Sequence, residues 1–134
     1  MNKLYYSYND LVSDCRIIAR EMAHESYKPD VIIGPGRGAY PFGVMLSHYF
    51  EVPFEAFRWQ TRDGKIEDSE TLKHILSKYI SKNILVVDDI NDSGKTLHGI
   101  SSVIKDFDSK QNNNMFTLHE GIKFATLFDK ESSE

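Results

Sequence analysis

A hydrophobic strand that runs directly into acidic residues is the feature that most restricts the fold of this chain. Residues 84–87 are Ile-Leu-Val-Val, four residues that favour β-structure, and Asp88 and Asp89 follow at once. A continuous apolar run of this length is typical of a strand buried on both faces, as in the parallel sheets of α/β proteins. We therefore predict a strand over 84–88. Its carboxyl end carries two carboxylates at the edge where open α/β sheets bind ligands.

The residues after this strand form a turn suited to an anion. Asp92 comes next, and residues 93–96 are Ser-Gly-Lys-Thr, at the start of a helix predicted over about 95–107. A turn of this composition can direct backbone N–H groups and a helix N-terminus at a phosphate. Carboxylates beside such a turn predict a ligand with a phosphate at one end and hydroxyls or a metal ion at the other.

A nucleotide-binding P-loop and an ordinary acidic turn are the other interpretations of this block. A nucleotide-binding P-loop would need a glycine at position 89, where a carboxylate, Asp89, would instead face the phosphates, so that interpretation is excluded. An ordinary acidic turn with Ser93 or Asp92 as the helix N-cap remains open for any single residue. Three carboxylates within five residues, followed by this turn, favour a binding site.

The rest of the chain alternates helices with strands. Asp10 is predicted to cap the first helix, and Pro29 and Asp30 to end it. The predicted helices cover residues 11–27, 41–50, 69–80 and 95–107, and the predicted strands cover 31–33, 52–57, 84–88 and 122–128. Such alternation implies an α/β fold with a mostly parallel, twisted sheet and helices on both faces. The loops after residues 34, 58, 88 and 128 should then converge at one edge of the sheet.

Two of these loops carry cations. Residues 34–38 are Gly-Pro-Gly-Arg-Gly, whose glycines permit close approach of N–H groups to an anion, and Arg37 adds a bidentate donor for phosphate oxygens. Residues 61–65, Thr-Arg-Asp-Gly-Lys, lie in a polar segment that has little to bury, so we predict a mobile loop there. By itself, each segment could also be a plain solvated turn.

Composition limits the class of protein. The 134 residues, 40% of them hydrophobic, suffice for one core and one domain. No apolar run approaches the ~18–20 residues of a membrane helix, and the N-terminus lacks the apolar segment of a signal peptide. Cys15 is the one cysteine, for which we expect a structural role in a reducing cytoplasm. A net charge of −4 without a basic run argues against nucleic acid as the main partner.

The 84–96 block resembles the phosphoribosyl-pyrophosphate signature of the type I phosphoribosyltransferases. In that family a hydrophobic strand runs into two acidic residues, two mostly apolar residues and then Asp-Thr/Ser-Gly-x-Thr, and Asn91 is the one departure here. The resemblance implies the type I phosphoribosyltransferase fold. It also implies that Asp88 and Asp89 approach the ribose hydroxyls and a bound Mg²⁺, and that residues 92–96 surround the 5′-phosphate.

The resemblance assigns roles to the other loops as well. Residues 36–38 match the pyrophosphate loop, and the 61–65 segment matches a loop that closes over the substrate, which makes Arg62 and Lys65 candidates to meet the pyrophosphate. Arg37 would stabilise the departing pyrophosphate, and Asp92 would either act as a base toward the incoming ring nitrogen or orient the purine by accepting its N–H. The implied phosphoribosyl-pyrophosphate contacts are Gly36, Arg37, Gly38, Arg62, Asp88, Asp89, Asp92, Ser93, Gly94, Lys95 and Thr96.

Within the family, the chain is most similar to the short xanthine–guanine type of 6-oxopurine phosphoribosyltransferase. In that type a lysine after the last core strand contacts the purine, which makes Lys130 the candidate, although a surface lysine there is equally ordinary. Those enzymes continue into a further strand and a hood that stacks on the base. Residues 1–134 are therefore expected to form a core domain that lacks the C-terminal hood.

The leading hypothesis is Mg²⁺-dependent transfer of a phosphoribosyl group from phosphoribosyl pyrophosphate to a purine base in purine salvage, yielding a nucleoside monophosphate and pyrophosphate. The resemblance also implies a homo-oligomer, either a dimer or a tetramer, and the composition predicts no membrane or nucleic-acid partner. The alternatives are a non-catalytic phosphoribosyl-pyrophosphate-binding regulator and a phosphoribosyltransferase for a different base. A phosphatase or other phosphotransfer enzyme with the acidic pair as its metal site is the remaining alternative.

Overall fold

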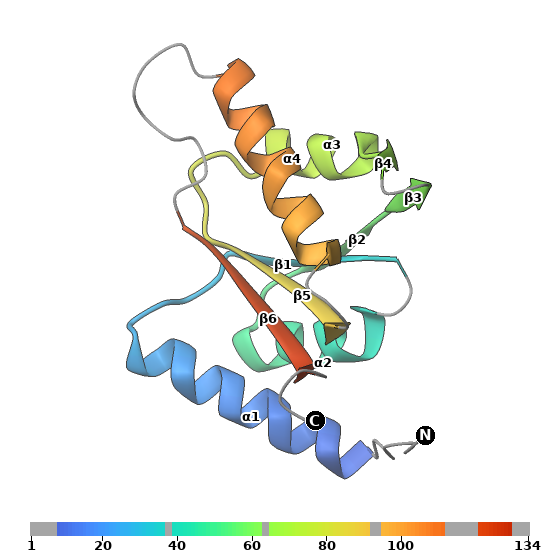
Figure 1. The fold of residues 1–134 in the computed structure, drawn as a ribbon. Helices are drawn as coiled ribbons and strands as arrows, with labels where there is room; N and C mark the ends of the chain where they lie inside the picture. The colour runs from blue at the N-terminus through green and yellow to red at the C-terminus, as the bar shows by residue number, and fades with distance from the viewer. Residues whose placement is uncertain (1–7, 37–38, 63–64, 92–94, 112–120, 130–134) are drawn as a thin grey trace.

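Four parallel strands form the main sheet of the molecule (Figure 1). The computed structural model describes residues 8–36, 39–62, 65–91, 95–111 and 121–129. The strands lie in the order β2-β1-β5-β6, and each neighbouring pair is parallel. Their bounds are β1 Val31–Pro35, β2 Phe54–Phe57, β5 Ile84–Asn91 and β6 Ile122–Asp129. All four carboxyl ends therefore meet at one edge, and the predicted α/β fold is confirmed.

Helices cover both faces of this sheet. Their bounds are α1 Tyr8–His24, α2 Tyr40–Phe50, α3 Glu70–Lys78 and α4 Lys95–Gln111. Helices α1 and α2 lie against one face, and α3 and α4 lie against the other (Figure 1). No helix in the described ranges is long and apolar enough to cross a membrane.

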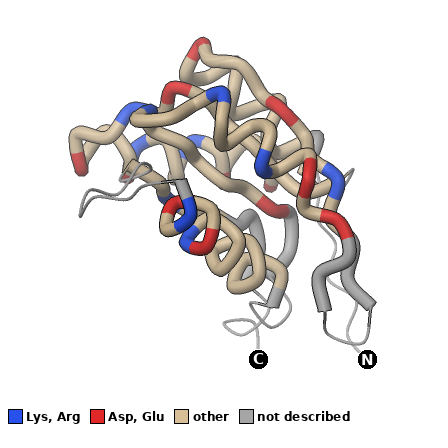
Figure 2. The backbone as a smooth tube through the Cα atoms, turned by 90° about the horizontal axis from the view of Figure 1, so that it is seen from above, with Lys and Arg blue, Asp and Glu red and all other residues tan. Residues whose placement is uncertain are grey.

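Charged residues of both signs are spread over the described backbone. Figure 2 shows Lys and Arg positions interspersed with Asp and Glu positions around the tube. Mixed charge of this kind gives no extended positive field that would attract a polyanion. This charge distribution and the composition are the basis for expecting no nucleic-acid partner. That expectation stays a prediction.

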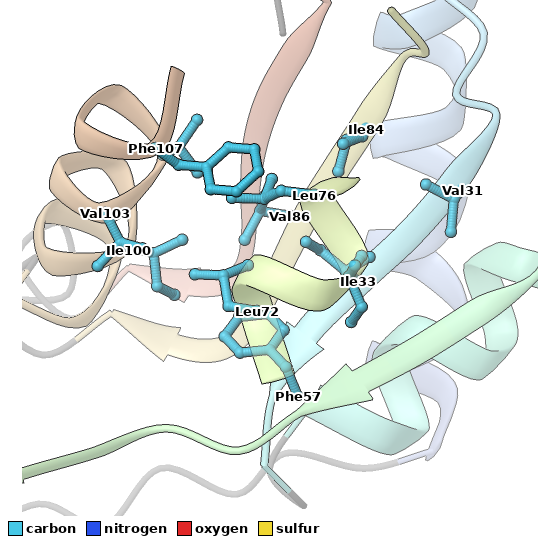
Figure 3. Packing of buried hydrophobic residues seen from close by; sticks show 12 residues of the cluster. Val31, Ile33, Phe57, Leu72, Leu76, Ile84, Val86, Ile100, Val103 and Phe107 are labelled. Atoms are coloured by element: carbon cyan, nitrogen blue, oxygen red, sulfur yellow. The ribbon is translucent and has the colours of Figure 1, made fainter. Parts of the chain in front are cut away.

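The core consists of two clusters, one on each side of the sheet. Successive side chains of a strand point to opposite faces, so Val31 and Ile33 of β1 join one cluster while Ile32 joins the other. On the α3 and α4 side, Leu72, Ile100 and their neighbours pack over Val86 and Phe57 (Figure 3). On the opposite side, the buried residues of α1 and α2 cover Ile32, Leu85 and Val87. The central strands β1 and β5 are thus buried on both faces, as their unbroken apolar sequences predict.

The first helix differs from the prediction at both ends. It begins at Tyr8, so Asp10 lies in its first turn instead of at its N-cap, where a carboxylate still interacts favourably with the helix dipole. It ends at His24, because Ser26 adopts a left-handed backbone with φ 58°. The Tyr27 N–H then donates to the Met22 carbonyl at 2.8 Å, which closes the helix before Pro29 is reached.

The polar segment after β2 was wrongly predicted to be a loop. It contains two short antiparallel strands, β3 Gln60–Arg62 and β4 Lys65–Asp68, which pair with each other and not with the main sheet. An Asp-Gly pair between two short runs is a hairpin signal, but too few apolar residues flank it here to indicate strands. Strand β5 also runs three residues further than predicted, to Asn91, because β6 pairs with it as far as Asp129.

Cys15 is a buried structural residue, as expected. It is fully buried in the core between α1, α2 and the sheet. Burial, together with the neighbouring Asp14 carboxylate, raises the pKa of the Cys15 thiol to about 11. A thiol with such a pKa is protonated at neutral pH and is a poor nucleophile.

A carboxylate on the edge strand β2 connects the sheet to α3. Glu55 accepts a hydrogen bond from the Tyr79 hydroxyl at 2.5 Å and pairs with Lys78 Nζ at 3.0 Å. Burial by itself would raise the pKa of Glu55, but the hydrogen bonds from Tyr79 and Lys78 outweigh it and lower that pKa. Burial and the same carboxylate raise the pKa of Tyr79 to about 12.

We expect Glu55→Gln to weaken the pH dependence of stability on the acid side. Since the folded-state pKa is lowered, the carboxylate stabilises the fold above its ordinary value of 4.5, and this contribution disappears as the pH falls through the folded-state pKa. The group is partly exposed, so the loss at neutral pH should be modest, about 0.5–1 kcal/mol. Denaturant unfolding at neutral and acidic pH measures it. Glu21→Gln, at an exposed position on α1, is the matched control. An equal loss for Glu55→Gln at all pH values would contradict this account.

Candidate functional site

The connections from the two central strands diverge, which predicts a crevice between their carboxyl ends. From β1 the chain passes through α2 to β2 on one side, and from β5 it passes through α4 to β6 on the other. Helix α2 packs on one face of the sheet and α4 on the opposite face. Such a topological switch point is where open α/β sheets bind ligands. The candidate site is therefore formed by the loops that follow β1 and β5.

At Gly34 the backbone of β1 lies in close contact with that of β5. The paired register runs from Val31 opposite Ile84 to Ile33 opposite Val86, and its continuation sets Gly34 beside Val87. A Cβ atom on Gly34 would lie 2.8 Å from the Val87 carbonyl oxygen and would also collide with the Ala39 Cβ. Only glycine therefore fits at position 34. Because it has no side chain, the β1 loop can begin beside the acidic end of β5.

The loop after β1 is also attached to β2. Gly36 has a left-handed backbone with φ 61°, which favours glycine, and its N–H donates to the Phe57 carbonyl at 2.9 Å. Among the described residues, and apart from its chain neighbours, no atom lies within 4 Å of the position that a Cβ on Gly36 would occupy. The hydrogen bond to Phe57 thus fixes the position at which the turn begins.

Helix α4 begins at the same edge. It starts at Lys95, directly after the loop that follows β5, and it is 17 residues long. Its first turn carries no acidic side chain, so no carboxylate there opposes the positive end of the helix dipole. Combined with the glycine turn at Gly36, this arrangement can hold an anion with several oxygens.

A family model described as the phosphoribosyl transferase domain matches residues 5–134. The chain belongs to this family. The membership in the type I phosphoribosyltransferases that the 84–96 block indicated is therefore confirmed.

Relatives and solved structures agree with this assignment. The hypoxanthine-guanine phosphoribosyltransferase of Schizosaccharomyces pombe is 29% identical over 117 residues, which are 72% of this chain and 56% of the relative. The enzyme of the same name from Streptococcus pyogenes serotype M3 is 24% identical over 136 residues, covering 97% of this chain and 70% of its own length. The purine phosphoribosyltransferase from Pyrococcus horikoshii superposes with a TM-score of 0.68 at 25% identity, covering 96% and 79%. This chain thus spans little more than half the length of the fission-yeast relative.

The phosphoribosyl transferase domain brings part of the predicted site together. Asp88 is half-buried on β5 opposite Thr126, and Asp89 continues the same strand. Lys95 and the half-buried Thr96 open α4. The β1 loop, with Gly36, follows the strand that pairs in parallel with β5.

Other predicted residues belong to the hairpin or lie outside the described residues. Arg62 belongs to β3, in the hairpin that follows β2. The predicted contacts outside the described ranges are Arg37, Gly38, Asp92, Ser93, Gly94 and Lys130. The sequence also gave no sign of Thr71, a residue of α3 that binds the backbone at the base of the hairpin.

We expect Gly34→Ala to damage the site and the fold together. The added methyl group must displace either the Val87 backbone or Ala39, and overpacking of this kind costs about 1–3 kcal/mol. Gly36→Ala is the control, because its Cβ would meet no atom of the described residues within 4 Å, and its positive φ is what opposes the change. Thermal unfolding of both variants measures the difference. A smaller loss of stability for Gly34→Ala than for Gly36→Ala would refute the space argument.

Proposed function

We propose that this protein transfers the 5-phosphoribosyl group of phosphoribosyl pyrophosphate to a purine base, of the 6-oxopurine class, in cytoplasmic purine salvage. The observation that carries the proposal is the meeting of three features at the switch point. These are the acidic end of β5, the N-terminus of α4 and the glycine turn after β1. The family match over residues 5–134 and the names of the relatives support the reaction class and the purine acceptor.

In the proposed complex the substrate lies across the β1–β5 crevice. Asp88 and Asp89 accept hydrogen bonds from the ribose hydroxyls, and residues 92–96 bind the 5′-phosphate with N–H groups at the start of α4. Residues 36–38 bind the pyrophosphate, with Arg37 as the cation. The phosphate and pyrophosphate ends are thus bound by loops from the two central strands.

The reaction breaks the bond between ribose C1 and the pyrophosphate oxygen, and it forms a bond from C1 to a ring nitrogen of the base. Arg37 stabilises the charge that builds up on the departing pyrophosphate, and Arg62 of the hairpin adds to it. The carboxylates at 88 and 89 lie beside the sugar as positive charge develops on it. Asp92 accepts the proton that the ring nitrogen loses. No covalent enzyme intermediate is needed.

The donor set fits a magnesium ion that arrives with the substrate. Within the described residues, no three His, Cys, Asp or Glu side chains are grouped closely enough to hold a metal by themselves. Mg²⁺ is commonly bound by one or two carboxylates together with substrate phosphates, a role that Asp88 and Asp89 can fill. When bound, the ion would supply charge neutralisation to the diphosphate.

Binding of phosphoribosyl pyrophosphate with Mg²⁺, measured by isothermal titration, tests the first half of the proposal. We expect Asp88→Asn and Asp89→Asn each to raise the Kd by roughly tenfold or more, since each removes a charged hydrogen-bond acceptor. Asp106→Asn is the matched control, because Asp106 lies on the exposed side of α4 and pairs with Lys110 at 3.3 Å. The proposal fails if the unmodified protein shows no binding at millimolar ligand.

The acceptor base is tested separately. We expect release of pyrophosphate with hypoxanthine, guanine or xanthine, and much less with adenine, uracil or orotate. Lys130→Ala should raise the KM for the base and leave the Kd of phosphoribosyl pyrophosphate unchanged, since the proposed contact is to the purine alone. Preference for a pyrimidine or for adenine would assign the protein to a different base.

The second candidate is a non-catalytic module that binds phosphoribosyl pyrophosphate. Such a module would bind phosphoribosyl pyrophosphate in the titration and would release no pyrophosphate with any base. The two experiments together therefore separate the two candidates.

A further inference from the structure

One hydroxyl on α3 holds the backbone at the point where β2 passes into the hairpin. Thr71 Oγ1 accepts a hydrogen bond from the Arg58 N–H at 2.9 Å. The same hydroxyl lies 3.5 Å from the Arg58 carbonyl oxygen and can donate to it. Both backbone groups of Arg58 are therefore bound by a single side chain from another element. Arg58 is the residue that separates the end of β2 from Trp59 and β3.

The residue before Arg58 is bound to the proposed pyrophosphate loop. The Phe57 carbonyl accepts the Gly36 N–H at 2.9 Å, and the buried Phe57 ring meets the Trp59 ring edge-on with centroids 6.1 Å apart. Residues 57–59 are thus attached to the β1 loop on one side and to Thr71 on the other. They form a short, well-held connection between that loop and the β3–β4 hairpin, which extends from the end of β2 (Figure 1).

The C-terminal end of the hairpin, at Asp68, also contacts Arg58. Asp68 Oδ1 accepts the Glu70 N–H at 3.2 Å, and Asp68 Oδ2 lies 3.4 Å from the Arg58 guanidinium. The Arg58 side chain is 70% exposed, so this ion pair contributes little in water. Thr71 binds the backbone of Arg58 directly, so it acts on where the hairpin begins independently of this ion pair.

We propose that Thr71 is a positioning residue that holds the β3–β4 hairpin in a fixed relation to the β1 loop. The inference rests on the proposed function, because the hairpin carries Arg62 and Lys65 as candidate partners of the pyrophosphate. A hairpin fixed at its base loses less conformational freedom when it meets the ligand, so the same contacts yield a higher affinity. Thr71 itself does not touch the substrate.

The test compares Thr71→Val, which keeps the shape of the side chain and removes the hydroxyl, with Thr71→Ser, which keeps the hydroxyl. For the valine variant we expect the Kd of phosphoribosyl pyrophosphate and of pyrophosphate to rise about three- to tenfold. The Kd of guanosine monophosphate, which lacks the pyrophosphate, should stay within twofold of the unmodified protein. The serine variant should restore tight binding. A merely structural defect would weaken all three ligands alike.

Ser77→Ala is the matched control on the same helix, because the Ser77 hydroxyl binds only the Lys73 carbonyl, at 3.2 Å, among the described residues. Amide hydrogen exchange of residues 60–62 and 65–68 is a readout that needs no ligand. We expect it to be about fivefold faster in Thr71→Val and unchanged in Ser77→Ala. Unchanged exchange, or equal weakening of guanosine monophosphate, would overturn the inference. Absence of phosphoribosyl pyrophosphate binding in the unmodified protein would instead refute the proposed function, and the exchange data would still decide whether Thr71 holds the hairpin.

Discussion

The parallel pairing of β1 with β5 is the interaction on which the rest of the structure depends. Both strands are buried on both faces, and they approach closely enough that only glycine fits at position 34, beside the Val87 carbonyl. Their chain connections leave on opposite sides, so a crevice for a ligand is expected between the carboxyl ends of these two strands. The pairing of β1 with β5 thus determines both the packing of the core and the location of the candidate site.

The loops at this crevice are held by different means. The β1 loop is attached through Gly36 to Phe57, the end of β5 is paired with β6, and the hairpin is bound at its base by Thr71 of α3. Backbone groups provide most of these attachments. Attachments of this kind give a rigid framework, which the proposed binding of a highly charged substrate requires.

Much of this architecture could be predicted, because the strongest signals are local. The apolar run at 84–87 and the acidic residues after it indicate a buried strand with a ligand site at its end, and the alternation of elements indicates a parallel sheet. Helix ends were less predictable: α1 stops at His24 because Ser26 takes a left-handed conformation. The β3–β4 hairpin was missed, since its polar strands carry too weak an alternation of apolar and polar residues to distinguish them from a loop.

By itself, the sequence determined the class of fold, the acidic strand end and the family resemblance, because each depends on residues that are neighbours in the chain. Only the tertiary structure decided that Gly34 must be glycine, that Phe57 binds the β1 loop and that Thr71 binds Arg58. These contacts join residues that are 13 to 53 positions apart in the chain, as the pairs Arg58–Thr71 and Gly34–Val87 illustrate. Packing of buried strands and helices brings these residues together, and no local pattern of residue types in the sequence predicts the contacts.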